Sequence, residues 1–279
     1  EFATETMENV AAAMHQTLGF KTMNMAILLS GGVGNRIHSD VPKQYISIGG
    51  RMLITYALAT LTEASAIDKI LIVAGYGWRE FIMANAKKNR ISTDKIMGFA
   101  TPGFNRQASI LSGMQEILRQ IDSGMLGDCP NCDENRKGIT SADTVFIHDA
   151  ARPMLSPKQV QDCFAALAGH DGVMPVLPMK DTVYLSRDGK TVSNLLDRSQ
   201  IFAGQAPELF RFKKYYQANM ALMPGCLASV NGSTEPAVLA GMDIVMIPGD
   251  EKNFKITTLE DLERFRSLKS RNETDAKEP

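Results

Sequence analysis

The chain has 279 residues, of which 44% are hydrophobic and 22% are charged, so it contains enough apolar material for a sizeable core. Thirty Lys and Arg against 31 Asp and Glu give a net charge of -1. This balance argues against the strongly basic surface that nucleic-acid and anionic-membrane partners select. An anionic substrate must therefore be met by a local cluster of cationic side chains.

No stretch approaches the roughly 18 uninterrupted apolar residues of a membrane-spanning helix, and the N-terminus lacks a signal-peptide pattern. Four cysteines are too few for a disulfide-rich fold of this size, so the expected location is the reducing cytoplasm. Two of them, Cys129 and Cys132, have the spacing of metal ligands. Because no second such pair and no His pair completes a zinc site, this spacing favours a plain loop.

Short apolar segments alternate with segments of helical periodicity along most of the chain. Strands that alternate with helices predict an α/β fold with a mixed, mostly parallel sheet and helices on both faces. The expected strands are 25–30, 69–74, 95–99, 144–147, 172–176 and 243–247, and the expected helices are 52–61, 78–88 and 106–121.

Two regions interrupt this alternation. Residues 122–142 are polar and aperiodic, which predicts a surface insertion. Residues 182–205 contain two β-prone runs around an Asp-Gly pair, the signal of a β-hairpin, and predict an arm that projects from the sheet. We expect an N-terminal extension over 1–24, a single domain over 25–269 and a flexible tail over 270–279.

A glycine-rich turn, Ser30–Arg36, directly follows the first expected strand. Glycines at a strand-to-helix turn let backbone N–H groups approach a phosphate closely. Ile37 occupies the third glycine position of a dinucleotide fingerprint, and no Gly-Lys-Ser/Thr of a P-loop follows. The cations that do follow, Arg36 and Lys43, suit a triphosphate. The alternative is a tight turn with solvated cations.

A second polar segment, His148–Pro153, follows the expected strand 144–147. Ligands of open α/β sheets bind at the carboxyl ends of strands, where this segment lies. The Asp149 carboxylate can bind a nucleotide-borne Mg²⁺, and Arg152 can bind a second phosphate. The alternative is an ion pair that closes a loop.

Together these segments resemble the 2-C-methyl-D-erythritol 4-phosphate cytidylyltransferases and their relatives, the ribitol-5-phosphate cytidylyltransferases. The resemblance runs from about residue 25 to about residue 265. It implies a Rossmann-like fold of nucleotidyltransferase type and transfer of CMP from CTP to a sugar-alcohol phosphate, with release of pyrophosphate. The matching segments are 32–36, 42–45, 103–109, 148–153, 180–182, 197–198, 204–207 and 253–257.

The resemblance also implies roles for particular residues. Because the acceptor phosphate oxygen is already a nucleophile, catalysis needs positioning and cations rather than a strong general base. The implied catalytic residues are Arg36, Lys43 and Lys255. The residues implied to hold CTP are Ser30, Gly31, Gly32, Gly34, Gly103, Ser109, Asp149 and Ala150, and Asp149 is also implied to bind Mg²⁺. The residues implied to hold the acceptor are Arg152, Thr182, Arg198 and Thr234.

The resemblance implies a homodimer formed through the hairpin arm, with no nucleic-acid or membrane partner. The preferred acceptor is 2-C-methyl-D-erythritol 4-phosphate, used in isoprenoid precursor synthesis, and Asp197-Arg198 favours it. Ribitol 5-phosphate, used in cell-surface polymers, is the alternative that Gly204-Gln205 favours. Ala206 and Glu235 depart from the family pattern on the acceptor side. A nicotinamide-dependent reductase and a catalytically silent nucleotide-binding protein are more distant alternatives.

Overall fold

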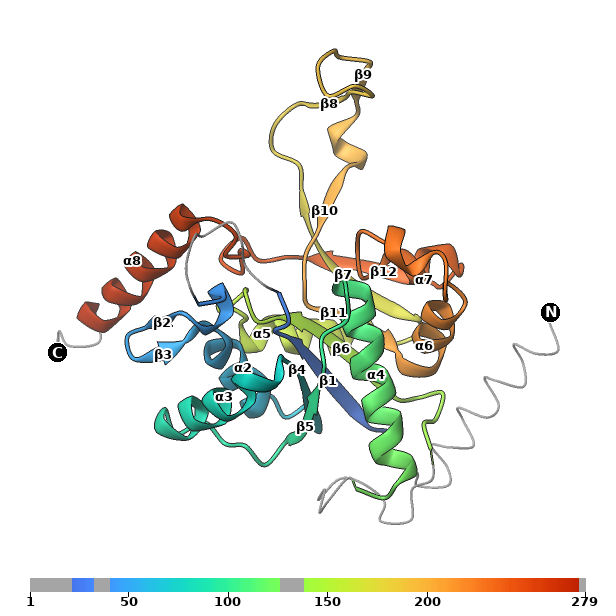
Figure 1. The fold of residues 1–279 in the computed structure, drawn as a ribbon. Helices are drawn as coiled ribbons and strands as arrows, with labels where there is room; N and C mark the ends of the chain where they lie inside the picture. The colour runs from blue at the N-terminus through green and yellow to red at the C-terminus, as the bar shows by residue number, and fades with distance from the viewer. Residues whose placement is uncertain (1–21, 33–40, 126–137, 276–279) are drawn as a thin grey trace.

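The computed structural model describes residues 22–32, 41–125 and 138–275, with side chains as far as Ser270. Within these ranges an eight-stranded sheet has the order β10-β7-β11-β6-β1-β4-β5, and β12 pairs with β7 (Figure 1). The strands are β1 Asn24–Leu29, β4 Lys69–Val73, β5 Ile96–Ala100, β6 Thr144–Asp149, β7 Gly172–Pro178, β10 Phe202–Gly204, β11 Glu208–Arg211 and β12 Ile244–Pro248.

The sheet is mixed. The first strand, β1, lies between β4 and β6 and runs parallel to both, with Leu28 opposite Ile72 on one side and His148 on the other. β5 extends the parallel part beyond β4, and β12 runs parallel to β7. By contrast, β11 is antiparallel to β6 and β7, and β10 is antiparallel to β7. This arrangement confirms the predicted α/β class and the mostly parallel sheet.

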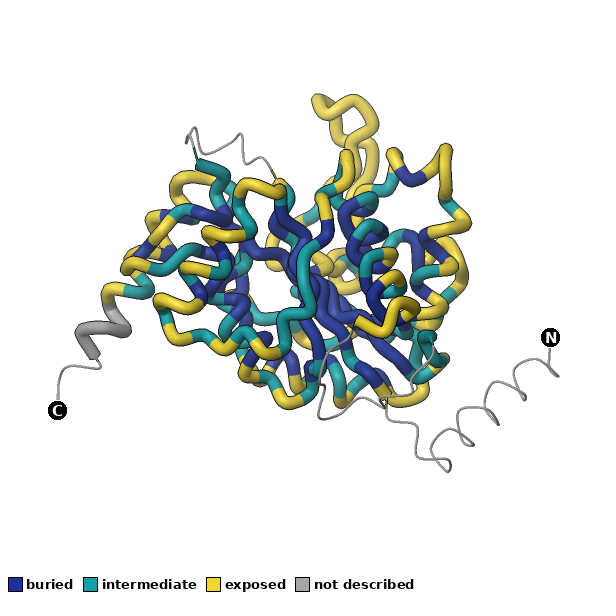
Figure 2. The backbone as a smooth tube through the Cα atoms, turned by 60° about the horizontal axis from the view of Figure 1, so that its bottom comes forward, coloured by how far each residue is buried: buried dark blue, intermediate teal, exposed yellow. Residues whose placement is uncertain are grey.

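Helices cover both faces of the sheet because each presents an apolar stripe to it. In α4, for example, Ile110, Met114, Ile117 and Ile121 recur at helical spacing and are buried in the same cluster. Figure 2 shows the buried sheet between more exposed helices. One face is covered by α2 Leu53–Glu63, α3 Tyr76–Lys88 and α5 Pro157–Ala166, and the other by α4 Arg106–Asp122, α6 Phe212–Met220 and α7 Glu235–Leu239.

A smaller cluster attaches the last helix, α8 Leu259–Asp275, through Leu262 and Phe265. These residues pack with Ile48 and Leu53, near the short hairpin of β2 Ser47–Ile48 and β3 Arg51–Met52. α8 continues past residue 270, where the sequence predicted a flexible tail. No helix in the described part of the chain is both long and apolar enough to cross a membrane.

The predicted hairpin arm is present. β8 Val183–Leu185 and β9 Asn194–Leu196 pair antiparallel and project from the body of the molecule (Figure 1). The Asp188 side chain shapes the turn between them, since it accepts hydrogen bonds at 2.8 Å from the backbone N–H groups of Lys190 and Thr191. The predicted range ran to residue 205, but β10, within that range, pairs with β7 and belongs to the main sheet.

The expected helices 52–61, 78–88 and 106–121 all form, with boundaries that differ by two residues or fewer. β6 is two residues longer than expected, because pairing with β1 continues as far as Leu29 and Asp149. Part of the predicted insertion 122–142 lies outside the described residues, and this part includes both Cys129 and Cys132.

A glycine in β7 generates a test of the packing between the sheet strands. A Cβ atom at Gly172 would lie 2.6 Å from Phe210 Cδ1 and 2.7 Å from Ile244 Cδ1. We expect Gly172→Ala to lower the free energy of unfolding by about 1–3 kcal/mol, the usual cost of overpacking a core, as measured by chemical denaturation.

Gly77→Ala is the matched control. Nothing lies within 4 Å of a Cβ atom there, and the residue is helical, so the same change should raise the free energy of unfolding by up to about 1 kcal/mol. Equal effects of the two substitutions would contradict the packing assigned to Gly172.

Candidate active site

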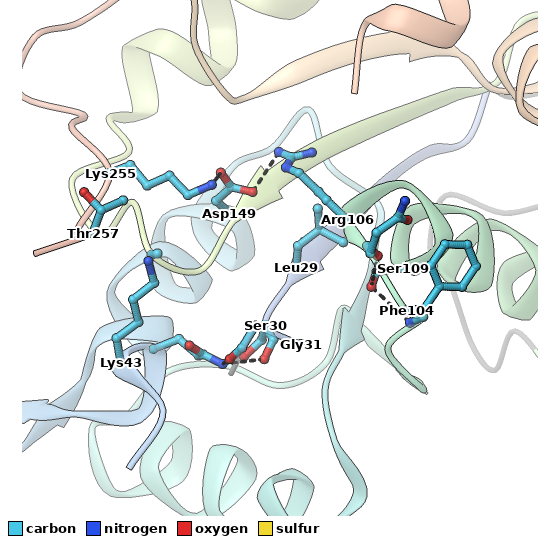
Figure 3. A pocket seen from close by; sticks show the side chains of 15 residues that line it. Leu29, Ser30, Gly31, Lys43, Phe104, Arg106, Ser109, Asp149, Lys255 and Thr257 are labelled. Atoms are coloured by element: carbon cyan, nitrogen blue, oxygen red, sulfur yellow. Dashed lines mark hydrogen bonds and ion pairs between the residues drawn. The ribbon is translucent and has the colours of Figure 1, made fainter. Parts of the chain in front are cut away.

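A pocket of about 820 Å³ opens where β1 and β6 end, at the carboxyl edge of the parallel strands (Figure 3). The structure brings eight of the predicted site residues together in its lining: Ser30, Gly31, Gly32, Lys43, Gly103, Ser109, Asp149 and Lys255. Seven further residues complete the lining: Leu29, Gln44, Phe104, Asn105, Arg106, Ala151 and Thr257.

The glycine turn after β1 is fixed by the 3₁₀ turn Lys43–Tyr45. Gln44 Nε2 donates to the carbonyl oxygens of Ser30 at 2.8 Å and Gly32 at 2.6 Å, and the Tyr45 hydroxyl donates to Ser30 O at 2.8 Å. The carbonyl groups of Ser30 and Gly32 are thereby engaged in hydrogen bonds within the protein. Lys43 begins this 3₁₀ turn and lines the pocket, and its side chain extends toward Thr257 and Lys255 (Figure 3).

The opposite wall begins at the N-terminus of α4. Asn105 caps this helix by accepting from Ala108 N at 2.7 Å. The Ser109 hydroxyl accepts from Gly103 N at 3.0 Å and donates to Asn105 O at 2.9 Å. A Cβ atom at Gly103 would lie 2.5 Å from the Ala108 Cβ, so only glycine fits. These contacts explain the spacing of the segment 103–109 as a helix cap closed by a serine.

Asp149 lies between the two walls and faces three cations. Its Oδ1 is 2.7 Å from Arg106 Nη2, and its Oδ2 is 3.0 Å from Lys255 Nζ and 3.7 Å from Arg152 Nε. Burial opposes ionisation of this carboxyl, but the three cations outweigh burial and hold its pKa well below the ordinary value. Asp149 therefore stays negatively charged throughout the physiological pH range.

The segment that carries Lys255 is attached to the end of β6. Ile256 N donates to Ala151 O at 2.8 Å, and Arg152 Nη1 donates to Asn253 O at 2.8 Å. Asn253 is fully buried and donates to Ala206 O at 2.9 Å. This contact uses the backbone carbonyl of Ala206. It therefore does not depend on the side chain, which is a threonine in the family pattern.

His148 is fully buried directly before Asp149 and supports the following loop. Its Nε2 lies 3.0 Å from the carbonyl oxygen of Arg152, which can only accept, so Nε2 carries the proton. Burial lowers the pKa of His148 to about 4, against a weaker opposing effect of that hydrogen bond. The neutral ring has a structural part in placing Arg152.

The residues predicted to meet the acceptor lie outside the pocket lining. Arg152 contacts Asp149 without lining the pocket, and the Thr234 hydroxyl donates to Met174 Sδ at 3.3 Å. Thr182 and Arg198 are exposed on the arm, where Arg198 Nη1 donates to Lys180 O at 2.7 Å.

Three other predictions have different outcomes. Ala150 contributes its backbone N–H to Leu29 O at 2.9 Å within the sheet, rather than to the pocket. Gly34 and Arg36 lie outside the described residues.

Three residues at the site, Arg106, Glu208 and Ser233, have no role assigned from the sequence. Arg106 lies three residues before Ser109 on the first turn of α4, and i,i+3 residues share a helix face, so this spacing could have placed it in the pocket. Glu208 and Ser233 carry no such signal. They meet through a hydrogen bond from the serine hydroxyl to Glu208 Oε1, and burial raises the pKa of Glu208.

The buried His148 generates a pH-dependent prediction. Below pH 6.5 the unfolded chain protonates this histidine, whereas the folded chain does so only near pH 4. Stability from this group is therefore lost as the pH falls through that interval, by about 3 kcal/mol at 1.36 kcal/mol per pKa unit. Unfolding free energies measured from pH 7 to pH 4 should fall less steeply for His148→Gln than for the parent. Identical slopes would contradict the buried neutral ring.

Known proteins resemble this chain in sequence and in fold. The model of the 2-C-methyl-D-erythritol 4-phosphate cytidylyltransferase family matches residues 24–126 and 136–268. An enzyme of that name from Lachnospira eligens is 27% identical over 246 residues, covering 86% of this chain and 96% of that protein. A ribitol-5-phosphate cytidylyltransferase from Lactiplantibacillus plantarum is 28% identical, covering 86% of this chain and 95% of that protein.

The bifunctional enzyme IspD/IspF of Maricaulis maris is 30% identical over 86% of this chain, which spans about half of that longer protein (55%). The fold resembles that of 4-diphosphocytidyl-2C-methyl-D-erythritol synthase from Anaerococcus prevotii, with a TM-score of 0.69 and 22% identity over 89% of this chain and 96% of that one. The Francisella tularensis 2-C-methyl-D-erythritol 4-phosphate cytidylyltransferase has a TM-score of 0.66, also at 22% identity, covering 88% and 99%. The chain belongs to the 2-C-methyl-D-erythritol 4-phosphate cytidylyltransferase family, a family of nucleotidyltransferases.

Proposed function

We propose that this protein transfers CMP from CTP to the phosphate of 2-C-methyl-D-erythritol 4-phosphate and releases pyrophosphate, a step of isoprenoid precursor synthesis. The observation that carries the proposal is the pocket itself. It brings Arg106 and Lys255, which pair with Asp149, into one lining with Lys43, beside a glycine turn at the end of a parallel strand. Ribitol 5-phosphate is the second candidate acceptor, and the relative from Lactiplantibacillus plantarum supports it.

The reaction is an in-line displacement at phosphorus. An oxygen of the acceptor phosphate forms a bond to the α-phosphorus of CTP. The bond between that phosphorus and the oxygen bridging to the β-phosphorus breaks, and pyrophosphate leaves with the electron pair. No proton must be removed from the nucleophile, so the protein contributes orientation and positive charge.

Each wall of the pocket has a part in this reaction. The backbone N–H groups of Gly31 and Gly32 would meet the CTP phosphates, whereas that of Ser30 donates to Val73 O at 2.8 Å. Lys43 and Lys255 would stabilise charge on the α-phosphate. Arg36 is proposed beside them on the resemblance alone. Gly103 and Ser109 lie at the far wall, where the cytosine and ribose would fit. The contacts between Gly103 and Ser109 keep that wall rigid.

Mg²⁺ is proposed as the cofactor that arrives with the nucleotide. Asp149 is the one carboxylate among the residues that line the pocket in the described chain. A nucleotide-borne Mg²⁺ needs only one or two protein carboxylates, since phosphates and waters supply the other ligands, so this donor set fits. When bound, the ion would neutralise charge on the departing pyrophosphate.

The acceptor side is proposed to be completed by a second copy of the chain. Arg152 and Thr234 belong to the body of the molecule, whereas Thr182 and Arg198 are exposed on the arm. The arm also exposes large apolar side chains: Tyr184 (57%), Leu185 (41%), Val192 (67%) and Leu195 (66%). A two-stranded hairpin is marginal alone and gains stability by packing against another surface. A two-fold homodimer would supply that surface.

We further propose a single domain over 25–269, with an extension over 1–24 and a tail over 270–279, in a cytoplasmic protein. The family match over 24–126 and 136–268 supports these domain limits. The net charge of -1 supports the absence of nucleic-acid and membrane partners.

Pyrophosphate release measured with four nucleotides and two acceptors tests the proposed function. We expect CTP to be preferred over UTP, ATP and GTP, and 2-C-methyl-D-erythritol 4-phosphate over ribitol 5-phosphate. The reverse acceptor preference would favour the second candidate. Equal rates with all four nucleotides would rule out the proposed cytidine site.

Subunit mixing tests the shared site. Lys43→Ala and Arg198→Ala should each be nearly inactive, since one preorganised donor contributes about 10²–10³ in rate. After subunit exchange, each heterodimer has one site with both residues intact, so the mixture should recover activity. A heterodimer confirmed by mass that stays as inactive as its parents would place Arg198 in its own chain's site or outside catalysis.

A further inference from the structure

Arg106 is held between two buried carboxylates at the first turn of α4. Its Nη2 lies 2.7 Å from Asp149 Oδ1 on the pocket side and 3.8 Å from Glu208 Oε2 on the other. The side chain of Arg106 is 28% exposed, against 9% for Asp149 and 10% for Glu208. Arg106 therefore lines the pocket as the most exposed of these three charged side chains, while both of its acidic partners are buried.

Glu208 is itself fixed from behind. Its Oε1 accepts a hydrogen bond from the Ser233 hydroxyl. The carbonyl of Ser233 accepts from the Tyr215 hydroxyl at 2.5 Å, and that hydroxyl accepts from Gln107 Nε2 at 3.0 Å. Gln107 follows Arg106 in α4, so the chain of contacts returns to the same helix turn. A carboxylate placed this firmly sets where its ion-pair partner can lie.

The pair is not saturated with hydrogen bonds. Among the described residues, Glu208 Oε2 and Arg106 Nη1 are buried without a hydrogen-bond partner. Asp149 is also shared with Lys255 and Arg152, so its charge is divided among three cations. Arg106 thus brings positive charge to the pocket lining that is not fully matched by hydrogen bonds, and its ion pair with Glu208 favours its position at the wall.

The position of Arg106 indicates which anion it would meet. Arg106 lies one helix turn from Ser109, at the proposed nucleoside end, and contacts Asp149, at the proposed reaction end. Figure 3 shows it reaching toward Asp149 from the wall opposite Lys43 and Lys255. A nucleotide that extends from Ser109 to Asp149 passes the guanidinium with its α-phosphate.

We infer that Arg106 is a further catalytic residue, whose guanidinium contacts the α-phosphate under transfer, and that Glu208 is the positioning residue that holds Arg106 there. This inference rests on the proposed function. A guanidinium donates two parallel hydrogen bonds to a phosphate, which an ammonium group cannot reproduce. Contact with the α-phosphate strengthens as negative charge develops on it, so the contribution appears in kcat rather than in CTP binding.

The experiment is a double-mutant cycle on kcat and on KM for CTP. Arg106→Ala should lower kcat about hundredfold, and Arg106→Lys about tenfold, with KM changed less than about fivefold. Glu208→Gln retains the shape and the acceptor for Ser233, so it should lower kcat about tenfold in the parent. In the Arg106→Ala background the same change should have almost no effect, because Glu208 acts through Arg106.

Added guanidinium ion gives a second measurement. It should raise the kcat of Arg106→Ala at least tenfold. The increase should be smaller in the double variant, where the Glu208 carboxylate is absent and no longer attracts the ion. Arg119→Ala is the matched control. Arg119 is exposed on the same helix and pairs with Glu116 at 2.7 Å, so this variant should keep the parent kcat and not respond to guanidinium.

Three outcomes overturn the inference. The first is a kcat of Arg106→Ala within threefold of the parent, and the second is a loss of kcat from Glu208→Gln that is equal in both backgrounds. The third is no increase of kcat by guanidinium in an Arg106→Ala variant that circular dichroism shows to be folded. If Arg106→Ala does not fold, the kcat values of Arg106→Lys and Glu208→Gln test the inference by themselves. A kcat equal to that of the parent in both variants then overturns it. A parent that transfers no CMP overturns the proposed function and the inference together, whereas an active parent with unaffected variants overturns the inference only.

Discussion

The ionised Asp149 is the constraint on which the site depends. A buried carboxylate without cations would be protonated or destabilising, so its charge requires Arg106, Arg152 and Lys255 to converge on it. Arg106 comes from the start of α4 and Lys255 from the segment before α8, while Asp149 and Arg152 come from the end of β6. One charge thus brings three distant parts of the chain together, and the pocket forms in the space between them.

The surrounding contacts place these charges without entering the chemistry. The neutral His148 holds the Arg152 carbonyl, and the buried Asn253 joins the Lys255 segment to the loop before β11. These are hydrogen bonds between neutral groups, which specify geometry without adding charge. The neutral side chains of His148 and Asn253 thus support the segments that carry Arg152 and Lys255 from outside the pocket lining.

The sequence predicts the parts of this design that are local. One predicted strand is followed by a glycine turn and another by Asp149, and both signals locate the carboxyl edge of the sheet. The spacing from Gly103 to Ser109 fits the start of one capped helix. Contacts across the fold have no such signature. Glu208 lies in a four-residue strand, and its partner Ser233 lies 25 residues away, so only tertiary packing brings them together. In the sequence, the departure from the family pattern at Glu235 directs attention to its neighbour Thr234. In the structure, Ser233 forms the buried hydrogen bond, which it donates to Glu208.

The strand order has a consequence for how the chain folds during synthesis. β1 is the first strand of the sheet in sequence, yet one of its two neighbours, β6, follows about 115 residues later. At about 5–20 residues per second, the edge of this mostly apolar strand stays open for roughly ten seconds before its partner is made. Such an edge can pair with other chains, and parallel pairing over long separations is slow. The strand that anchors the nucleotide turn is thus also a segment of the nascent protein that needs protection from aggregation.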